Sequence, residues 1–65
     1  MQVIINGEQK SLNGPLTVAD ILREMSIEGK IAVEINREIL PRSQFGQYQV
    51  CNGDIVEIVH AIGGG

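Results

Sequence analysis

The residues of this sequence with the clearest chemical potential are the three glycines at its end, Gly63, Gly64 and Gly65. Glycine has no Cβ and loses more backbone freedom than any other residue when it becomes ordered, so a packed domain gains little from such a run. The same property lets a thin, extended chain enter a narrow channel of another protein. We therefore expect 63–65 to be a flexible tail that presents the carboxylate of Gly65 to a partner enzyme. An ordinary disordered terminus or an expression remnant is the alternative.

Two further residues, Cys51 and His60, are reactive types that occur once each. One cysteine excludes an internal disulfide and a paired-cysteine zinc motif, and one histidine forms no metal cluster. A thiolate can carry a persulfide, but no cationic residue adjoins Cys51 in the sequence, so we expect a structural role beside the turn that follows. His60 is expected to be a partly exposed strand residue. The sequence predicts no catalytic residue, no metal site and no bound cofactor.

Size and composition limit what the chain can do alone. Its 65 residues form one domain at most, with 43% apolar residues and a net charge of −3. A domain this small has little room for a deep substrate cleft. It carries no basic run for nucleic acid, no signal peptide and no apolar stretch of about 20 residues. We expect a cytoplasmic protein that binds neither nucleic acid nor membrane and that is not itself an enzyme.

The first elements form a hairpin. Met1, Val3 and Ile5 alternate along one face, and Asn6-Gly7 favours the positive φ angles of a tight turn. A second, antiparallel strand is expected over 8–12, since Gly14-Pro15 then breaks the pattern.

One amphipathic helix is predicted over about 18–27. Thr17 is a good N-cap residue, and Asp20 three positions later completes a variant capping box. The apolar stripe is made of Val18, Ile21, Leu22 and Met25. Gly29 can adopt the left-handed conformation that closes a helix end.

The second half of the chain is again strand-like. Ile31, Val33 and Ile35 alternate with polar residues, and Ile39-Leu40 forms a short strand that ends at Pro41. The segment 42–50 is irregular, with one turn of 3₁₀ helix expected.

The last predicted strand runs over 55–62, after the turn at 52–54. Val56 and Ile58 should face the core, whereas Ile55, Glu57, Val59 and Ala61 should face outward.

The order ββαβββ predicts an α+β domain over 1–62 with the β-grasp, or ubiquitin-like, fold. First and last strands rich in β-branched residues would pair at the centre of a mixed sheet of four to five strands. The single helix would cover one face of that sheet.

An exposed apolar patch beside the tail is predicted from Val59, Ala61 and Ile62. Exposed apolar surface next to a reactive terminus is typical of a docking surface. Ordinary sheet packing is the other explanation. Arg42 either contacts a partner or caps the irregular segment, and we favour the second role.

The sequence resembles the ThiS family, the sulfur carriers of bacterial thiamine biosynthesis, over nearly its whole length. The resemblance rests on Met1 to Gly7, Thr17-Val18 with Leu22, Asn36 to Arg42, Gly53-Asp54 and the terminal Gly64-Gly65. Relatives often carry a small residue such as alanine where this chain has Gly63.

The resemblance implies a specific chemistry for the tail. An E1-like enzyme would use Mg-ATP to adenylate Gly65, with Gly63 and Gly64 threading its active site. A cysteine desulfurase route would supply the persulfide that converts the adenylate to a thiocarboxylate, which would then donate sulfur to a thiazole synthase. The alternatives are a molybdopterin synthase small subunit, a ubiquitin-like modifier and a plain binding module.

Overall fold

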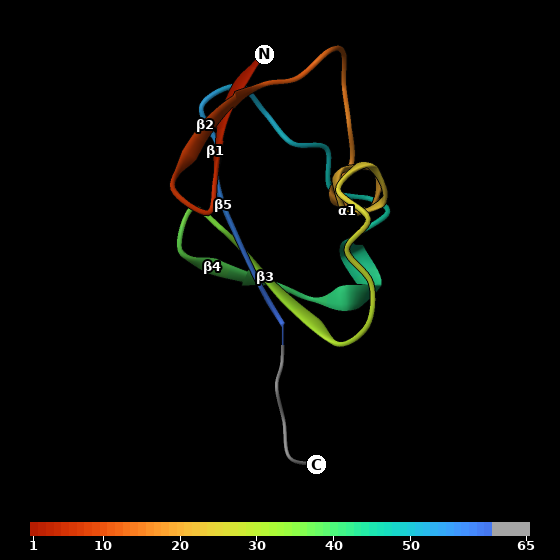
Figure 1. Cartoon of the computed structure of the whole chain (residues 1–65). Helices are drawn as coiled ribbons and strands as arrows, with labels where there is room; N and C mark the ends of the chain where they lie inside the picture. The colour runs from red at the N-terminus through yellow and green to blue at the C-terminus, as the bar shows by residue number, and fades with distance from the viewer. Residues whose placement is uncertain (61–65) are drawn as a thin grey trace.

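The computed structural model describes residues 1–60 of the chain, and residues 61–65 lie outside the described part (Figure 1). Five strands form a single sheet in the order β2-β1-β5-β3-β4. One helix, α1 (Val18–Glu24), lies on one side of this sheet. The α+β class and the helix on one face, both expected from the sequence, are confirmed.

The first and last strands are neighbours at the centre of the sheet. β1 (Gln2–Ile5) pairs with β5 (Ile55–His60) in parallel, with Ile4 opposite Ile55. β3 (Ile31–Ile35) lies on the other side of β5 and runs antiparallel to it. The sheet is therefore mixed, and β5 joins its two hairpins into one unit.

Each hairpin ends in a tight turn that contains asparagine. β1 and β2 (Glu8–Ser11) meet at Asn6-Gly7, and β3 and β4 (Glu38–Leu40) meet at Asn36-Arg37. All four turn residues have positive φ, which matches the right-handed twist of a two-residue hairpin. The turn at Asn36 was not predicted, because Arg37 is not a typical residue at φ 72°.

Both asparagine side chains also hold β5. Asn6 Oδ1 accepts the N–H of Ile58 at 2.8 Å, and Asn36 Oδ1 accepts the N–H of Ile55 at 2.9 Å. A third asparagine, Asn52, accepts the N–H of Gln2 at 2.8 Å. These bonds satisfy backbone N–H groups that the sheet ladder leaves free.

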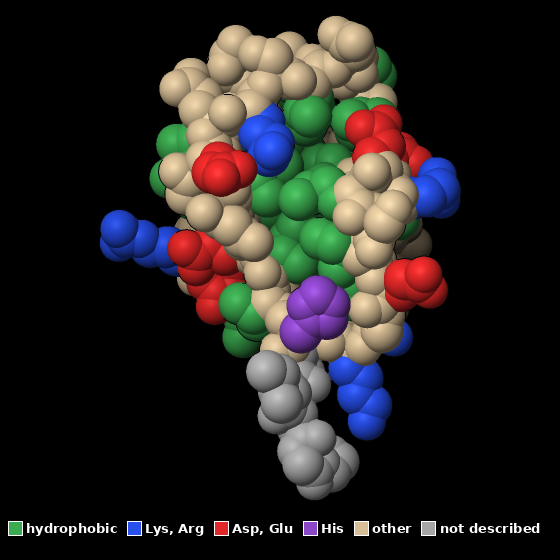
Figure 2. All heavy atoms as spheres, in the orientation of Figure 1, with side chains coloured by type: hydrophobic (Ala, Val, Ile, Leu, Met, Phe, Trp, Pro, Cys, Tyr) green, Lys and Arg blue, Asp and Glu red, His purple; other side chains and the backbone are tan. Residues whose placement is uncertain are grey.

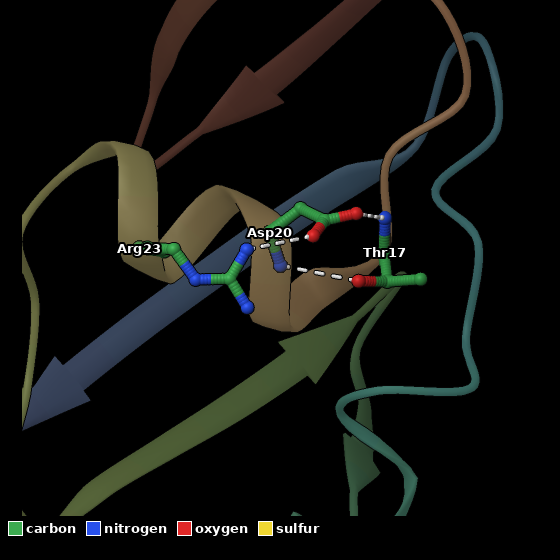
Figure 3. A network of polar contacts seen from close by, with 3 residues as sticks. All are labelled: Thr17, Asp20 and Arg23. Atoms are coloured by element: carbon green, nitrogen blue, oxygen red, sulfur yellow. Dashed lines mark hydrogen bonds and ion pairs between the residues drawn. The ribbon is translucent and has the colours of Figure 1, made fainter.

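The helix begins with the predicted capping box (Figure 3). The Thr17 hydroxyl accepts the N–H of Asp20 at 3.1 Å, and the Asp20 carboxylate accepts the N–H of Thr17 at 3.0 Å. Arg23 adds a contact to Asp20 at 3.2 Å. The two reciprocal bonds satisfy backbone donors that the first turn of a helix leaves unpaired, which fixes where the helix starts.

The helix ends earlier than the sequence predicts. Its last residue is Glu24, and Ser26 rather than Gly29 adopts the left-handed conformation that closes it, with φ 57°. The N–H of Ile27 reaches back to the carbonyl of Leu22 at 2.9 Å, and that of Ser26 to Arg23 at 3.1 Å. This pair of bonds is a Schellman motif.

Two expectations for this region are therefore wrong. The predicted helix over 18–27 is too long, and Met25, placed on the apolar stripe, is 38% exposed. The early turn brings Ile27 back onto the core instead. Gly29 has φ 98° but lies in the following loop, where its carbonyl accepts a bond from Arg42 at 2.7 Å.

Ser26→Gly should stabilise the domain. A side chain in the left-handed region costs about 1 kcal/mol, and glycine removes that cost while adding some freedom to the unfolded chain. The side chain of Ser26 is exposed, so little contact is lost. We expect the free energy of unfolding to rise by about 0.5 kcal/mol in urea titrations. Ser26→Ala, which keeps the strained φ, is the control, and an equal rise in that variant would contradict the explanation.

The core lies between the helix and the inner face of the sheet. Its least exposed side chains, at 2% or below, are those of Val3, Ile5, Val18, Val33 and Val56. Figure 2 shows hydrophobic side chains gathered in the middle of the view, with charged side chains around them. Burial of each such side chain stabilises the fold by roughly 1.5–3 kcal/mol. Val56 and Ile58 point inward as predicted.

The irregular segment after β4 contains a single turn of 3₁₀ helix, Arg42–Gln44, as expected. Phe45 and Val50 from this segment complete the core. The bond from Arg42 to the Gly29 carbonyl ties the segment to the loop before β3, which agrees with the structural role predicted for Arg42.

Candidate functional site

The candidate site begins where β5 ends, because the predicted tail follows this strand. Val59 is opposite Ala32 and His60 is opposite Ile31 in the β3 register. The pairing of β5 with β1 involves only its first two residues, Ile55 and Val56. The end of β5 thus lies away from the N-terminus and, within residues 1–60, is paired with β3 alone (Figure 1).

The outer face of the sheet carries exposed apolar side chains from three of its strands. Ile4, Ile55 and Val59 are 37%, 43% and 57% exposed, and Ile39 at the sheet edge is 77% exposed. Residues next to them in sequence face the core, so strand alternation directs these side chains outward. Neighbouring apolar side chains exposed on one sheet face are typical of a docking surface.

The predicted docking residues can be placed only in part. Val59 is exposed on the outer face, as expected. Ala61 and Ile62 lie outside the described residues, as do Gly63, Gly64 and Gly65. Their assigned roles, the end of the domain at residue 62 and the tail over 63–65 therefore stay predictions.

Ile4, Ile39 and Ile55 are exposed apolar residues outside the patch predicted from the sequence, although Ile55 was expected to face outward. Ile4 alternates with buried Val3 and Ile5, so its outward position could have been read from strand periodicity. Ile39 belongs to a strand of three residues, too short for its facing to be predicted from a pattern.

A buried polar network surrounds Asp54, just before β5. The Asp54 carboxylate accepts the N–H of Cys51 at 2.8 Å, the hydroxyl of Tyr48 at 2.9 Å and the side-chain amide of Asn36 at 3.0 Å. Asp54 is only 7% exposed, yet both its oxygens are used. The network joins the β3–β4 turn, the irregular segment and the start of β5.

The network shifts the pKa of two of its members. Burial alone would raise the pKa of Asp54, but the hydrogen bonds from Cys51, Asn36 and Tyr48 outweigh it and hold that pKa below its usual value. Burial, together with the bond to Asp54, raises the pKa of Tyr48 to about 12. Both shifts favour the state in which the Asp54 carboxylate is charged and the Tyr48 phenol is neutral.

These shifts predict how stability depends on pH. The lowered pKa of Asp54 stabilises the fold above about pH 4, and this contribution is lost as pH falls through the folded-state value. The raised pKa of Tyr48 stabilises the fold below about pH 10 and is lost as pH rises toward about 12. Since Tyr48 is the chain's one tyrosine, tyrosinate absorbance reports it directly. Ionisation near pH 10 in the folded protein, or an unchanged alkaline transition in Tyr48→Phe, would contradict this assignment.

Cys51 and His60 lie at opposite ends of β5. Cys51 is an exposed free cysteine in the turn before the strand, and its Sγ–H donates to the carbonyl of Gln49 at 3.6 Å. The strand between Ile55 and His60 spans roughly 16 Å. His60 is exposed, and no hydrogen bond within residues 1–60 joins its ring to a carboxylate. His60 is thus an exposed strand residue, as expected, whereas the structural role expected for Cys51 stays a prediction.

Within residues 1–60, no group of three or more histidine, cysteine or acidic side chains is placed to hold a metal ion. A search of the same residues finds no helix with the length and hydropathy needed to cross a membrane.

Comparison with known proteins gives a consistent result. The model of the ThiS family matches residues 3–65. The sulfur carrier protein ThiS of Bacillus subtilis is 40% identical over 50 residues, which cover 75% of this chain and 76% of that protein. The Escherichia coli sulfur carrier protein ThiS is 30% identical, with both chains fully covered.

A second kind of relative is much longer. A thiazole synthase of Paramagnetospirillum magneticum is 44% identical to this chain over 66 residues. These cover all of this chain but only 20% of the synthase, so the chain spans about one fifth of that relative.

The comparison with solved structures agrees with these sequence matches. The crystal structure of the thiamine biosynthesis protein ThiS from Geobacter metallireducens superimposes with a TM-score of 0.87, at 32% identity and full coverage of both chains. This similarity confirms the predicted β-grasp fold. The family match bears out the resemblance stated from the sequence rather than any of its alternatives: the chain belongs to the ThiS family of sulfur carrier proteins.

Proposed function

We propose that this chain carries sulfur for thiazole formation in thiamine biosynthesis, with the carboxylate of Gly65 as the loading site. The observation that supports this most is the family match, which extends from residue 3 through the three glycines to residue 65. Partners bind the folded domain in this role, and the tail supplies the reacting group. In this role the chain is a recycled co-substrate and contributes no acid, base or oxyanion hole.

The chemistry follows from the weak reactivity of a carboxylate. A carboxylate oxygen is a poor leaving group, so an E1-like partner would first join Gly65 to AMP from Mg-ATP, with release of pyrophosphate. The terminal sulfur of a persulfide, supplied by a cysteine desulfurase, would attack the carbonyl carbon and expel AMP. Cleavage of the remaining S–S bond by a thiol would leave the thiocarboxylate. Its sulfur is ionised at neutral pH and is a strong nucleophile.

Thiazole synthase is the proposed acceptor of this sulfur. In the P. magneticum relative, a stretch similar to the whole of this chain is part of a protein named thiazole synthase. Covalent linkage of two partners is a common way to raise their effective concentration. The cytoplasm is the proposed compartment, since an exposed free thiol such as Cys51 stays reduced there.

One experiment tests the function directly. The purified chain is incubated with the E1-like enzyme of the same organism, a cysteine desulfurase, cysteine and Mg-ATP, and its intact mass is then measured. We expect a gain equal to the replacement of one oxygen by one sulfur. No gain with partners that are shown to be active would refute the proposal.

A further inference from the structure

Two glutamates lie directly opposite each other on the outer face of the sheet. Glu34 of β3 and Glu57 of β5 are paired in the antiparallel register. Their neighbours Val33, Ile35, Val56 and Ile58 are buried, so both carboxylates belong to the outer face. Side chains in such a pair have Cβ atoms about 5 Å apart.

The described residues place no counter-charge beside this pair. Like charges directly opposite each other across two strands are destabilising. The ion pairs among residues 1–60 are Lys10–Glu8 and Arg23–Asp20, and neither includes Glu34 or Glu57. The hydrogen bonds of the same residues also leave both carboxylates without a side-chain partner. Within residues 1–60, the two carboxylates thus make neither an ion pair nor a side-chain hydrogen bond.

The surroundings of the pair are apolar. Ile39 is opposite Glu34 on one side, and the next pair along the β3–β5 ladder on the same face is Ala32 with Val59. Together with Val33 and Glu57, these four residues line a shallow hollow of about 120 Å³. The carboxylates thus lie within the apolar outer face described above.

We propose that this hollow is a socket for one arginine or lysine side chain of thiazole synthase, surrounded by apolar side chains of the same surface. A cation between Glu34 and Glu57 would convert their repulsion into two charge-assisted contacts. Ile39 and Val59 would exclude water around them and so strengthen the electrostatic contact. The inference rests on the proposed function, because it names how a partner of that function is recognised.

Charge complementarity favours such a partner over a second copy of this chain. A two-fold dimer through this face would bring the Glu34–Glu57 pairs of both copies together. The chain also has eight acidic against five basic residues. A purely apolar partner surface would leave two carboxylates buried without a counter-charge, which is strongly unfavourable.

The test is the affinity for the thiazole synthase of the same organism, measured by biolayer interferometry with wild-type chain and the double variant Glu34→Gln/Glu57→Gln. We expect the variant to bind at least about tenfold more weakly, because contacts to charged groups are lost. Salt should weaken the wild-type complex more than the variant complex. The melting temperature of the variant should be unchanged or higher, since the repulsion is gone. A merely structural pair would not give weaker binding together with an equal or higher melting temperature.

The matched control is Glu24→Gln/Glu28→Gln, which removes the same charge from exposed residues of the helix end and the loop after it. It should bind within about twofold of wild type. Ile39→Ala, at a side chain 77% exposed, should keep the melting temperature and weaken binding. Equal losses in the control, unchanged binding in the Glu34/Glu57 variant, or a loss confined to the E1-like enzyme would each overturn the inference. Sulfur loading of every variant is measured separately, so a failure of the proposed function is distinguished from a failure of docking.

Discussion

Deletion of Gly65 should abolish sulfur loading while leaving the domain folded. The proposed reaction needs the carbonyl carbon of the last residue next to ATP in the activating enzyme. Moving the carboxylate to Gly64 shortens the reach by one residue, about 3.5 Å in an extended chain. Because a displacement of about 1 Å can cost roughly 100-fold in rate, a shift of this size should leave no measurable product.

Substitutions within the tail distinguish the effect of its length on sulfur loading from the effect of its width. Gly64→Val keeps the length but adds a branched side chain, and we expect its loading rate to fall roughly 100-fold if the channel admits only a bare backbone. Gly63→Ala should load at nearly the wild-type rate, since the added methyl group is small and lies two residues from the reacting carboxylate. Intact mass after a timed reaction measures both.

The melting temperature of each tail variant is the control for folding. Equal loading of Gly64→Val and wild type would contradict the narrow-channel explanation. Normal loading after deletion of Gly65 would contradict the assignment of the reacting carboxylate.

Asp54→Ala should give the largest loss of stability of any single polar substitution in the described chain. It leaves the N–H of Cys51, the hydroxyl of Tyr48 and the side-chain amide of Asn36 without their acceptor. Each bond to a charged group is worth about 1.5–3 kcal/mol, although the three are not additive. We expect a loss of about 3 kcal/mol or more in the free energy of unfolding, measured in urea. The free energy of unfolding of a domain of this size is only a few kcal/mol, so part of the variant's population should be unfolded at room temperature.

Two milder variants make this prediction specific. Tyr48→Phe removes one donor and should lower the free energy of unfolding by about 1 kcal/mol. Asp54→Asn keeps one acceptor, so its loss should lie between those of Tyr48→Phe and Asp54→Ala. In the double variant Tyr48→Phe/Asp54→Ala the losses should be less than additive, because the two side chains share a bond. Strict additivity, or a loss below about 1 kcal/mol for Asp54→Ala, would show that the network does not anchor β5.

The sequence predicted those features that depend on a few consecutive residues. Asn6-Gly7 determines a hairpin turn because its backbone angles are local. Thr17 and Asp20 determine the helix start because both capping bonds lie within one turn. The alternation in β5 separates Val56 and Ile58 from Ile55 and Val59, since strand periodicity needs no partner. The glycine run and the stretch over 36–42 indicated the family for the same reason.

The tertiary structure decided what depends on contacts between distant segments. The helix ends at Glu24 because Ile27 turns back to the core, an advantage that outweighs the strained φ of Ser26. Asp54 is buried and accepts several hydrogen bonds because the fold brings Asn36 and Tyr48 beside it. In the sequence it is only an acidic residue in a turn. Glu34 and Glu57 are separated by 22 intervening residues, and only the strand register makes them opposite neighbours. The sequence alone therefore indicated the family and predicted the tail as the reacting part, whereas the surface that a partner would recognise follows from pairing between strands far apart in the chain.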